Sequence, residues 1–176
     1  MGALALKPSL YDRDYYAWLI EQAAHIRARR LDQLDYEALA EELEDMGRSE
    51  RRAVENYLKN LLLHLLKWAV QTERRSGSWR DSIDTARDAV ADLLRDSPSL
   101  KPQLSEFVTR QYDRARRSAV NQTGMAEKNF PAKCPFGLDE ILDHTFFPGG
   151  SVREERSPVL PRGGARKKEG GPKKKV

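Results

Sequence analysis

The sequence predicts an all-α fold: a bundle of about five main helices around one central buried helix. Five segments carry apolar residues at the spacing i, i+3, i+4 and i+7, which is typical of one helix face. One of them, residues 49–71, is apolar over more than half of its circumference at about 100° per residue. No segment alternates apolar and polar residues in the period of two that would indicate a strand.

The central helix reads SERRAVENYLKNLLLHLLKWAVQ over residues 49–71. A narrower polar stripe on this helix is interrupted by Leu63 and Val70, so we expect other helices to pack against it on several sides. Its apolar arc consists of Val54, Tyr57, Leu58, Leu61, Leu62, Leu65, Leu66, Trp68 and Ala69.

Two helices are expected before it, over residues 11–29 and 36–46. Asp35 is a candidate N-cap for the second of these. Gly47 follows at the position where a left-handed residue often ends a helix, and Ser49 then caps the central helix. The buried stripe of the second helix is predicted to be Leu39, Ala40, Leu43 and Met46.

Two further helices are expected after it, over residues 79–95 and 100–122. Ser78 is the predicted cap of the first, and Thr123-Gly124 is the predicted stop of the second. Residues 125–148 contain three prolines and allow only short helical turns, at 125–129 and 138–143. Their phenylalanines are expected to close one end of the bundle as a short C-terminal helical cap.

The sequence divides into a lead-in at residues 1–10, a helical domain at 11–148 and a basic tail at 149–176. The tail holds nine basic and three acidic residues and no apolar periodicity, so we expect it to be disordered. The remaining 148 residues hold 22 basic and 24 acidic side chains. The net charge of +4 is therefore a property of the tail, and only the tail has a charge argument for binding nucleic acid.

The sequence also indicates a soluble, cytoplasmic protein with no membrane association. Cys134 is the single cysteine and cannot form an internal disulfide, which fits a reducing compartment. The most hydrophobic run, residues 61–70, is shorter than the ~20 residues that span a bilayer, and it contains His64 and Lys67.

Six motifs are spread along the sequence: YDRDYYAWL at 11–19, LAEELEDMGRSERR at 39–52, LLLHLLKW at 61–68, RSGSWRDSI at 75–83, SPSLKP at 97–102 and CPFGLDEIL at 134–142. Together they resemble the bacterial domain-of-unknown-function family numbered twenty-nine. The resemblance covers residues 11–148 and implies an all-α domain in a bacterial cytoplasm, with no assigned activity and no catalytic residues to carry over.

His64 and the acidic cluster Glu41–Asp45 are the candidates for chemistry. His64 could be a metal ligand or a general base, because its side chain titrates near neutrality. Metal sites in helical bundles typically contain Glu-x-x-His pairs, however. Here Leu61 occupies the position three residues before His64, where such a pair has a glutamate. A hydrogen-bonded structural histidine is therefore the simpler interpretation. The acidic cluster is interpreted as a solvated face or one that pairs with nearby arginines, with a partner surface or a site as alternatives.

No catalytic, cofactor-binding or metal-ligating residue is predicted, and no cofactor. We expect a non-enzymatic helical module that binds an unidentified protein partner. An enzyme or metal-binding bundle with a polar site near His64 is one alternative. A nucleic-acid-associated protein that uses its basic tail is the other. The sequence leaves the oligomeric state open.

Overall fold

The computed structural model describes residues 9–149, and within this range the chain is helical with no strand. The lead-in up to Pro8 and the tail from Gly150 lie outside the described residues. The predicted all-α class is confirmed. The longer helices are α2 (Tyr15–Arg27), α3 (Tyr36–Val70), α4 (Gly77–Asp96) and α5 (Leu104–Thr123), with the short helices α1 (Leu10–Arg13) and α6 (Leu138–Leu142).

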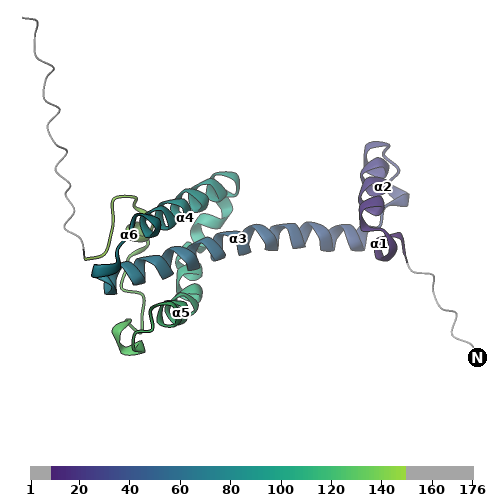
Figure 1. Ribbon diagram of the computed structural model, residues 1–176. Helices are drawn as coiled ribbons and strands as arrows, with labels where there is room; N and C mark the ends of the chain where they lie inside the picture. The colour runs from purple at the N-terminus through teal and green to yellow at the C-terminus, as the bar shows by residue number, and fades with distance from the viewer. Residues whose placement is uncertain (1–8, 150–176) are drawn as a thin grey trace, which may run out of the picture.

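The helices expected at 36–46 and 49–71 are one continuous helix, α3, of 35 residues (Figure 1). The predicted break at Gly47 is wrong, because positive φ occurs at Gly124 and Gly149 but not at Gly47. Glycine inside a helix costs only about 1 kcal/mol relative to alanine. Arg48 offsets part of this cost, since its ion pairs with Glu44 and Asp45 bridge the glycine.

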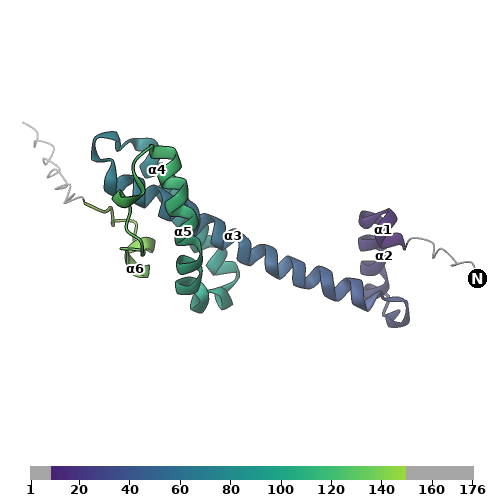
Figure 2. The same cartoon turned by 90° about the horizontal axis from the view of Figure 1, so that it is seen from below.

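The core lies around the second half of α3, where α4 and α5 pack on it (Figure 2). Leu58, Leu61, Leu62 and Leu65 of α3 are each fully buried, as are Ile83 of α4 and Phe107 of α5. The predicted apolar arc is therefore correct along most of its length. Tyr57, at the edge of this region, is 40% exposed.

Helix boundaries around α4 and α5 differ slightly from the expected ones. α4 begins at Gly77 after Ser76, and neither Ser76 nor the expected Ser78 makes a capping bond to the helix backbone; their hydroxyls bond to each other at 2.9 Å. The chain then makes a 3-10 helix, Pro98–Gln103, before α5 begins at Leu104. Gly124, at φ 67°, ends α5 as predicted.

Three arginines hold the irregular segment after α5 by donating to its backbone carbonyls. Arg87 of α4 donates to the carbonyls of Ile141 at 2.9 Å and Phe146 at 2.8 Å. Arg116 donates to Phe130, and Arg75 donates to Pro148. Such bonds matter because a segment without regular structure cannot satisfy its own buried carbonyls.

The expected phenylalanine cap lies over this end of the bundle. Phe130 is 1% exposed, and Phe147 packs on Trp68 with ring centroids 5.0 Å apart.

Helices α1 and α2 do not join the bundle. They form a hairpin at the opposite end of α3, so two of the five expected helical segments, 11–29 and 36–46, lie away from the core (Figures 1 and 2). Within residues 9–149, no helix combines the length and apolarity that a membrane crossing requires.

Candidate functional site

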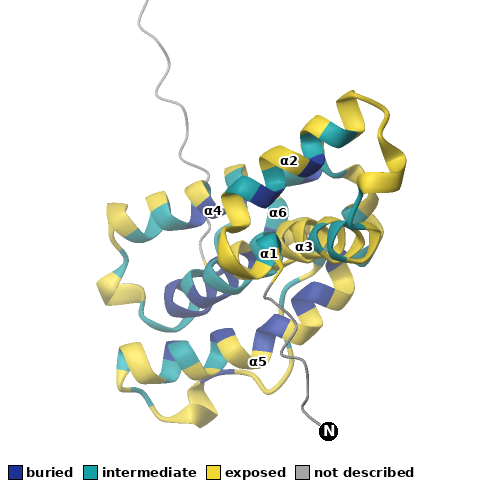
Figure 3. Cartoon of the chain, turned by 90° about the vertical axis from the view of Figure 1, so that its right-hand side faces the viewer, coloured by how far each residue is buried: buried dark blue, intermediate teal, exposed yellow. Residues whose placement is uncertain are grey.

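The part of the chain before the bundle is its most unusual surface, and we call residues 9–53 the arm. It consists of α1, α2 and the first half of α3, up to the residue before Val54, the first fully buried side chain of α3. In Figure 3 dark blue marks buried turns of α4 and α5, whereas α1 and α2 are mostly yellow and teal. The arm therefore offers surface rather than core.

Helix α2 is seated on α3 by a small number of contacts. Trp18 and Gln22 are its two buried residues. The Gln22 side-chain oxygen accepts the backbone N–H of Asp35 at 2.9 Å, which ties α2 to the start of α3. Tyr11 packs edge-on against Trp18 with ring centroids 4.8 Å apart. This hairpin buries little apolar area for its length.

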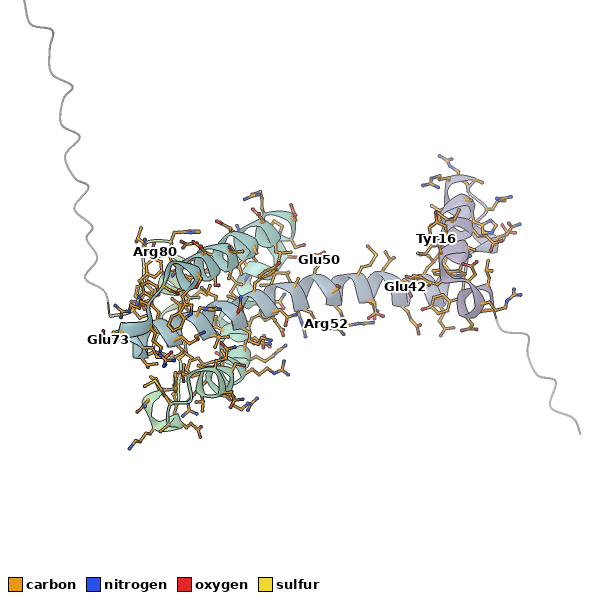
Figure 4. The ribbon with its side chains drawn as sticks, in the orientation of Figure 1. Tyr16, Glu42, Glu50, Arg52, Glu73 and Arg80 are labelled. Atoms are coloured by element: carbon orange, nitrogen blue, oxygen red, sulfur yellow. The ribbon has the colours of Figure 1, made fainter. Side chains whose placement is uncertain are left out.

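Glu42 fixes the hairpin to α3 from the other side. The Tyr11 hydroxyl donates to one of its carboxylate oxygens at 2.6 Å, and the Tyr15 hydroxyl donates to the other. The bond to Glu42 is the main reason that the pKa of Tyr11 is raised to about 12, and it raises the pKa of Tyr15 as well. Figure 4 shows Glu42 at the junction between the hairpin and α3.

Between the hairpin and the bundle, α3 runs as a single bare helix. Every residue from Leu43 to Arg52 is exposed. The predicted burial of Leu43 and Met46 is wrong: they are 68% and 65% exposed, because no element of the described chain covers this face. Ala40 is also exposed, and Leu39 is only half-buried. In Figure 4, Glu50 and Arg52 project to opposite sides of this stretch.

Large exposed hydrophobic residues gather in and beside the arm. In residues 9–149 there are nine of them, and none lies beyond residue 57. They are Tyr15, Tyr16, Ile20, Ile26, Leu31, Tyr36, Leu43, Met46 and Tyr57. Single exposed apolar residues are ordinary on protein surfaces, but their concentration on one part of the chain makes the arm a candidate contact surface.

His64 lies on the bundle half of α3, away from the acidic cluster. Glu44 and His64 are twenty residues apart on one straight helix, which is about 30 Å at ~1.5 Å per residue. The two therefore cannot form one site. Burial, and then the charge of Lys67, lower the pKa of His64. Its buried Nδ1 has no hydrogen-bond partner within the described chain, so the expected bonded histidine is not seen at that atom.

The acidic cluster itself is exposed and partly salt-paired. Glu44 and Asp45 both bind Arg48, at 3.1 and 2.7 Å, and Glu42 accepts the two tyrosine hydroxyls. No group of three or more His, Cys, Asp or Glu side chains could hold a metal ion within residues 9–149. Cys134 is half-buried, and burial raises the pKa of its thiol, which disfavours the nucleophilic thiolate.

A polar cavity between α3 and α5 was not anticipated from the sequence. It measures about 380 Å³, and four arginines line it: Arg51, Arg52, Arg110 and Arg114. Glu55 lies among them and accepts from Arg110 at 2.9 Å and from the Gln111 amide at 2.7 Å. The i, i+4 spacing of Arg110 and Arg114 was the available signal, but their proximity to α3 depends on packing.

The match to known families covers both the arm and the bundle. The family model described as "Domain of unknown function DUF29" matches residues 10–147. The chain belongs to this family. The family's description assigns no activity, and the match ends where the predicted tail begins. No match was found among curated proteins or among solved structures.

Proposed function

We propose that this DUF29 chain is a non-enzymatic protein-interaction module of a bacterial cytoplasm, and that the arm is its binding surface. The single observation that carries the proposal is that, within residues 9–149, every exposed large hydrophobic side chain lies between residues 15 and 57. The bundle supplies a fixed base for this surface, since α3, α4, α5 and the C-terminal segment share one buried core.

The chemistry of the arm suits recognition better than catalysis. Tyrosine is enriched in protein interfaces because it adds contact area at a low cost in conformational entropy, and methionine adapts to varied partners. Tyr16 is 73% exposed and Met46 is 65% exposed. An enzymatic or metal site near His64 has less support, because the carboxylates that could have completed it lie about 30 Å away along α3.

A capture experiment tests the proposal. Immobilised full-length chain is incubated with lysate of its native host, and bound proteins are quantified by mass spectrometry. The test variant is Tyr16→Glu/Ile20→Glu, which places two charges on the exposed face of α2. The control is Ser105→Glu, an exposed position on α5 of the bundle.

We expect the test variant to lose at least about tenfold of the specific enrichment, which corresponds to ~1.4 kcal/mol, and the control to keep it. Circular dichroism should show equal helix content in all three proteins, because none of the changed side chains is buried. Equal enrichment by wild type and the test variant would contradict binding through the arm.

A further inference from the structure

We propose that the exposed stripe of α3 pairs with the same stripe of a second copy of this chain, with the two helices antiparallel. This inference rests on the proposed function and names the partner of one face of the arm. The stripe is the row of positions that begins at Tyr36 and ends at Tyr57.

The stripe has the spacing of a coiled-coil seam. Steps of three and four residues alternate along it, through Tyr36, Leu39, Leu43, Met46, Glu50, Ala53 and Tyr57. Such a heptad row lies on one side of a helix and packs against another helix. Glu37, Glu41, Asp45, Arg48 and Arg52 fall at the outward-facing positions of the same heptads.

The seam is not filled within the described chain. Tyr36, Leu43 and Met46 are each more than 60% exposed. Tyr11 of α1 and Tyr15 of α2 bind α3 at Glu42, which is not a position of the seam. Beyond residue 53, α3 enters the bundle, where α4 runs antiparallel to it (Figure 1). An antiparallel helix on the stripe would have the same direction relative to α3 as α4 has.

The distribution of charge favours a second copy and sets its direction. Residues 9–46 hold ten acidic and four basic side chains, a net charge of −6. Residues 47–149 hold 14 acidic and 17 basic side chains, a net charge of +3. An antiparallel pair places the acidic end of each arm beside the more basic half of the other copy. A parallel pair would place the two acidic ends together.

Among the registers that the heptads allow, we propose the one that pairs the whole row from Tyr36 to Ala53 with the same row of the other copy. Leu43 of one copy lies opposite Met46 of the other, and Leu39 lies opposite Glu50. The two-fold axis then passes between Glu44 and Asp45, at the start of the bare stretch. In this register Glu50 of one copy lies opposite Leu39 of the other, near the end of the paired row. In another register Glu50 would lie opposite a different residue, so the neighbour of Glu50 identifies the register.

Sedimentation velocity of the full chain at about 10–100 μM tests self-association, which depends on concentration. We expect a dimer of the 20.1 kDa chain, and a monomer for Leu43→Glu/Met46→Glu at the same concentrations. Ile26→Glu changes an exposed side chain of α2 outside the stripe and should remain dimeric. A monomeric wild type, or a dimer that Leu43→Glu/Met46→Glu leaves intact, overturns the proposal.

Disulfide cross-linking tests the direction, in a Cys134→Ser background. A mixture of Leu39→Cys and Glu50→Cys chains should form a cross-linked dimer under mild oxidation, and neither chain should do so alone. Cross-linking of Leu39→Cys with itself would show a parallel pair and overturn the antiparallel one. The wild-type chain could prove monomeric while the Tyr16→Glu/Ile20→Glu variant still fails to capture the proteins that the wild type captures. That pair of results would overturn the proposed dimer but would leave the proposed function supported.

Discussion

At the scale of single residues, the buried charge of Arg87 holds the C-terminal segment in place, a role that the sequence did not indicate. Arg87 is 1% exposed, yet it carries a guanidinium that binds two carbonyls of the C-terminal segment at 2.8–2.9 Å and lies 3.7 Å from Asp84. Its ring contact with Phe147 adds a cation–π interaction at 5.4 Å. Burial lowers the pKa of Arg87, and the charges of Asp84 and Asp143 oppose that shift.

Replacing Arg87 should destabilise the protein strongly. In Arg87→Met the carbonyls of Ile141 and Phe146 lose their donor, and an unsatisfied buried group costs about 1–3 kcal/mol. We expect a loss of at least ~2 kcal/mol in urea unfolding. Arg95→Met is the control, because the Arg95 side chain is 71% exposed and forms a surface ion pair with Asp92, so the loss should stay below ~1 kcal/mol. Equal losses would contradict the role of Arg87.

His64 should make stability depend on pH. Its pKa is lowered in the folded protein, so the unfolded chain binds the proton more readily. The free energy of unfolding is then highest above the ordinary pKa of 6.5 and falls as the pH drops from 6.5 toward the lowered value, below which the His64 contribution stays constant. Urea unfolding at pH 7 and at pH 5 measures this effect. Between these two pH values the free energy of unfolding should fall less in His64→Gln than in the wild type. An identical loss would show that His64 does not titrate in this way.

At the scale of elements, the length of α3 organises the molecule. A single helix of 35 residues is about 52 Å long at ~1.5 Å per residue, so its two ends cannot share one core. The bundle forms where leucines supply apolar area, and the hairpin forms where Trp18, Gln22 and Glu42 supply local contacts. The bare stretch between them is the consequence.

Two glycines should respond in opposite ways to the same change. Gly47 is helical, and a Cβ there would meet nothing within 4 Å, so Gly47→Ala should stabilise α3 by about 0.5–1 kcal/mol. Gly124 has φ 67°, which an alanine adopts only under strain, so Gly124→Ala should destabilise. Thermal unfolding by circular dichroism measures both. A destabilising Gly47→Ala would mean that the helix is interrupted there.

At the scale of the whole molecule, charge is distributed in opposing blocks. The arm is acidic, the bundle is weakly basic, and residues 150–176 add nine basic and three acidic side chains outside the described part. Contact between that tail and the acidic arm would be screened, since the Debye length is about 8 Å at physiological salt. We therefore expect the tail to contribute little to the stability of the domain.

Removing residues 150–176 should leave the free energy of unfolding of the domain unchanged within ~0.5 kcal/mol. The large aliphatic residues of this segment are Val152, Val159, Leu160 and Val176. Their burial could not offset the backbone entropy cost of ordering the segment, which is ~1–2 kcal/mol per residue. The cut keeps Pro148, whose carbonyl accepts from Arg75 at 3.1 Å. Urea unfolding compares the two proteins. Any salt-sensitive affinity for duplex DNA should disappear with the tail. A truncated chain that still binds DNA would assign that property to the domain.

The sequence by itself determined the helical class, the leucine-rich core of α3, the stop at Gly124 and the phenylalanine cap. These follow from local rules: periodicity along one helix, the conformational freedom of glycine, and the burial of large apolar groups. Its resemblance to the family also extended over nearly the same residues as the match, 10–147.

Only the tertiary structure decided whether each apolar face has a neighbour. Leu43 and Met46 have the same spacing as Leu58 and Leu61, yet the first pair is exposed and the second is buried. Periodicity reports which side of a helix is apolar, and not what lies against it. Local sequence rules also could not show that α3 continues through Gly47, because a glycine inside a helix costs only about 1 kcal/mol relative to alanine and need not end it. Whether a neighbouring element packs on an apolar face depends on the whole chain, and here none covers Leu43 and Met46 within the described residues.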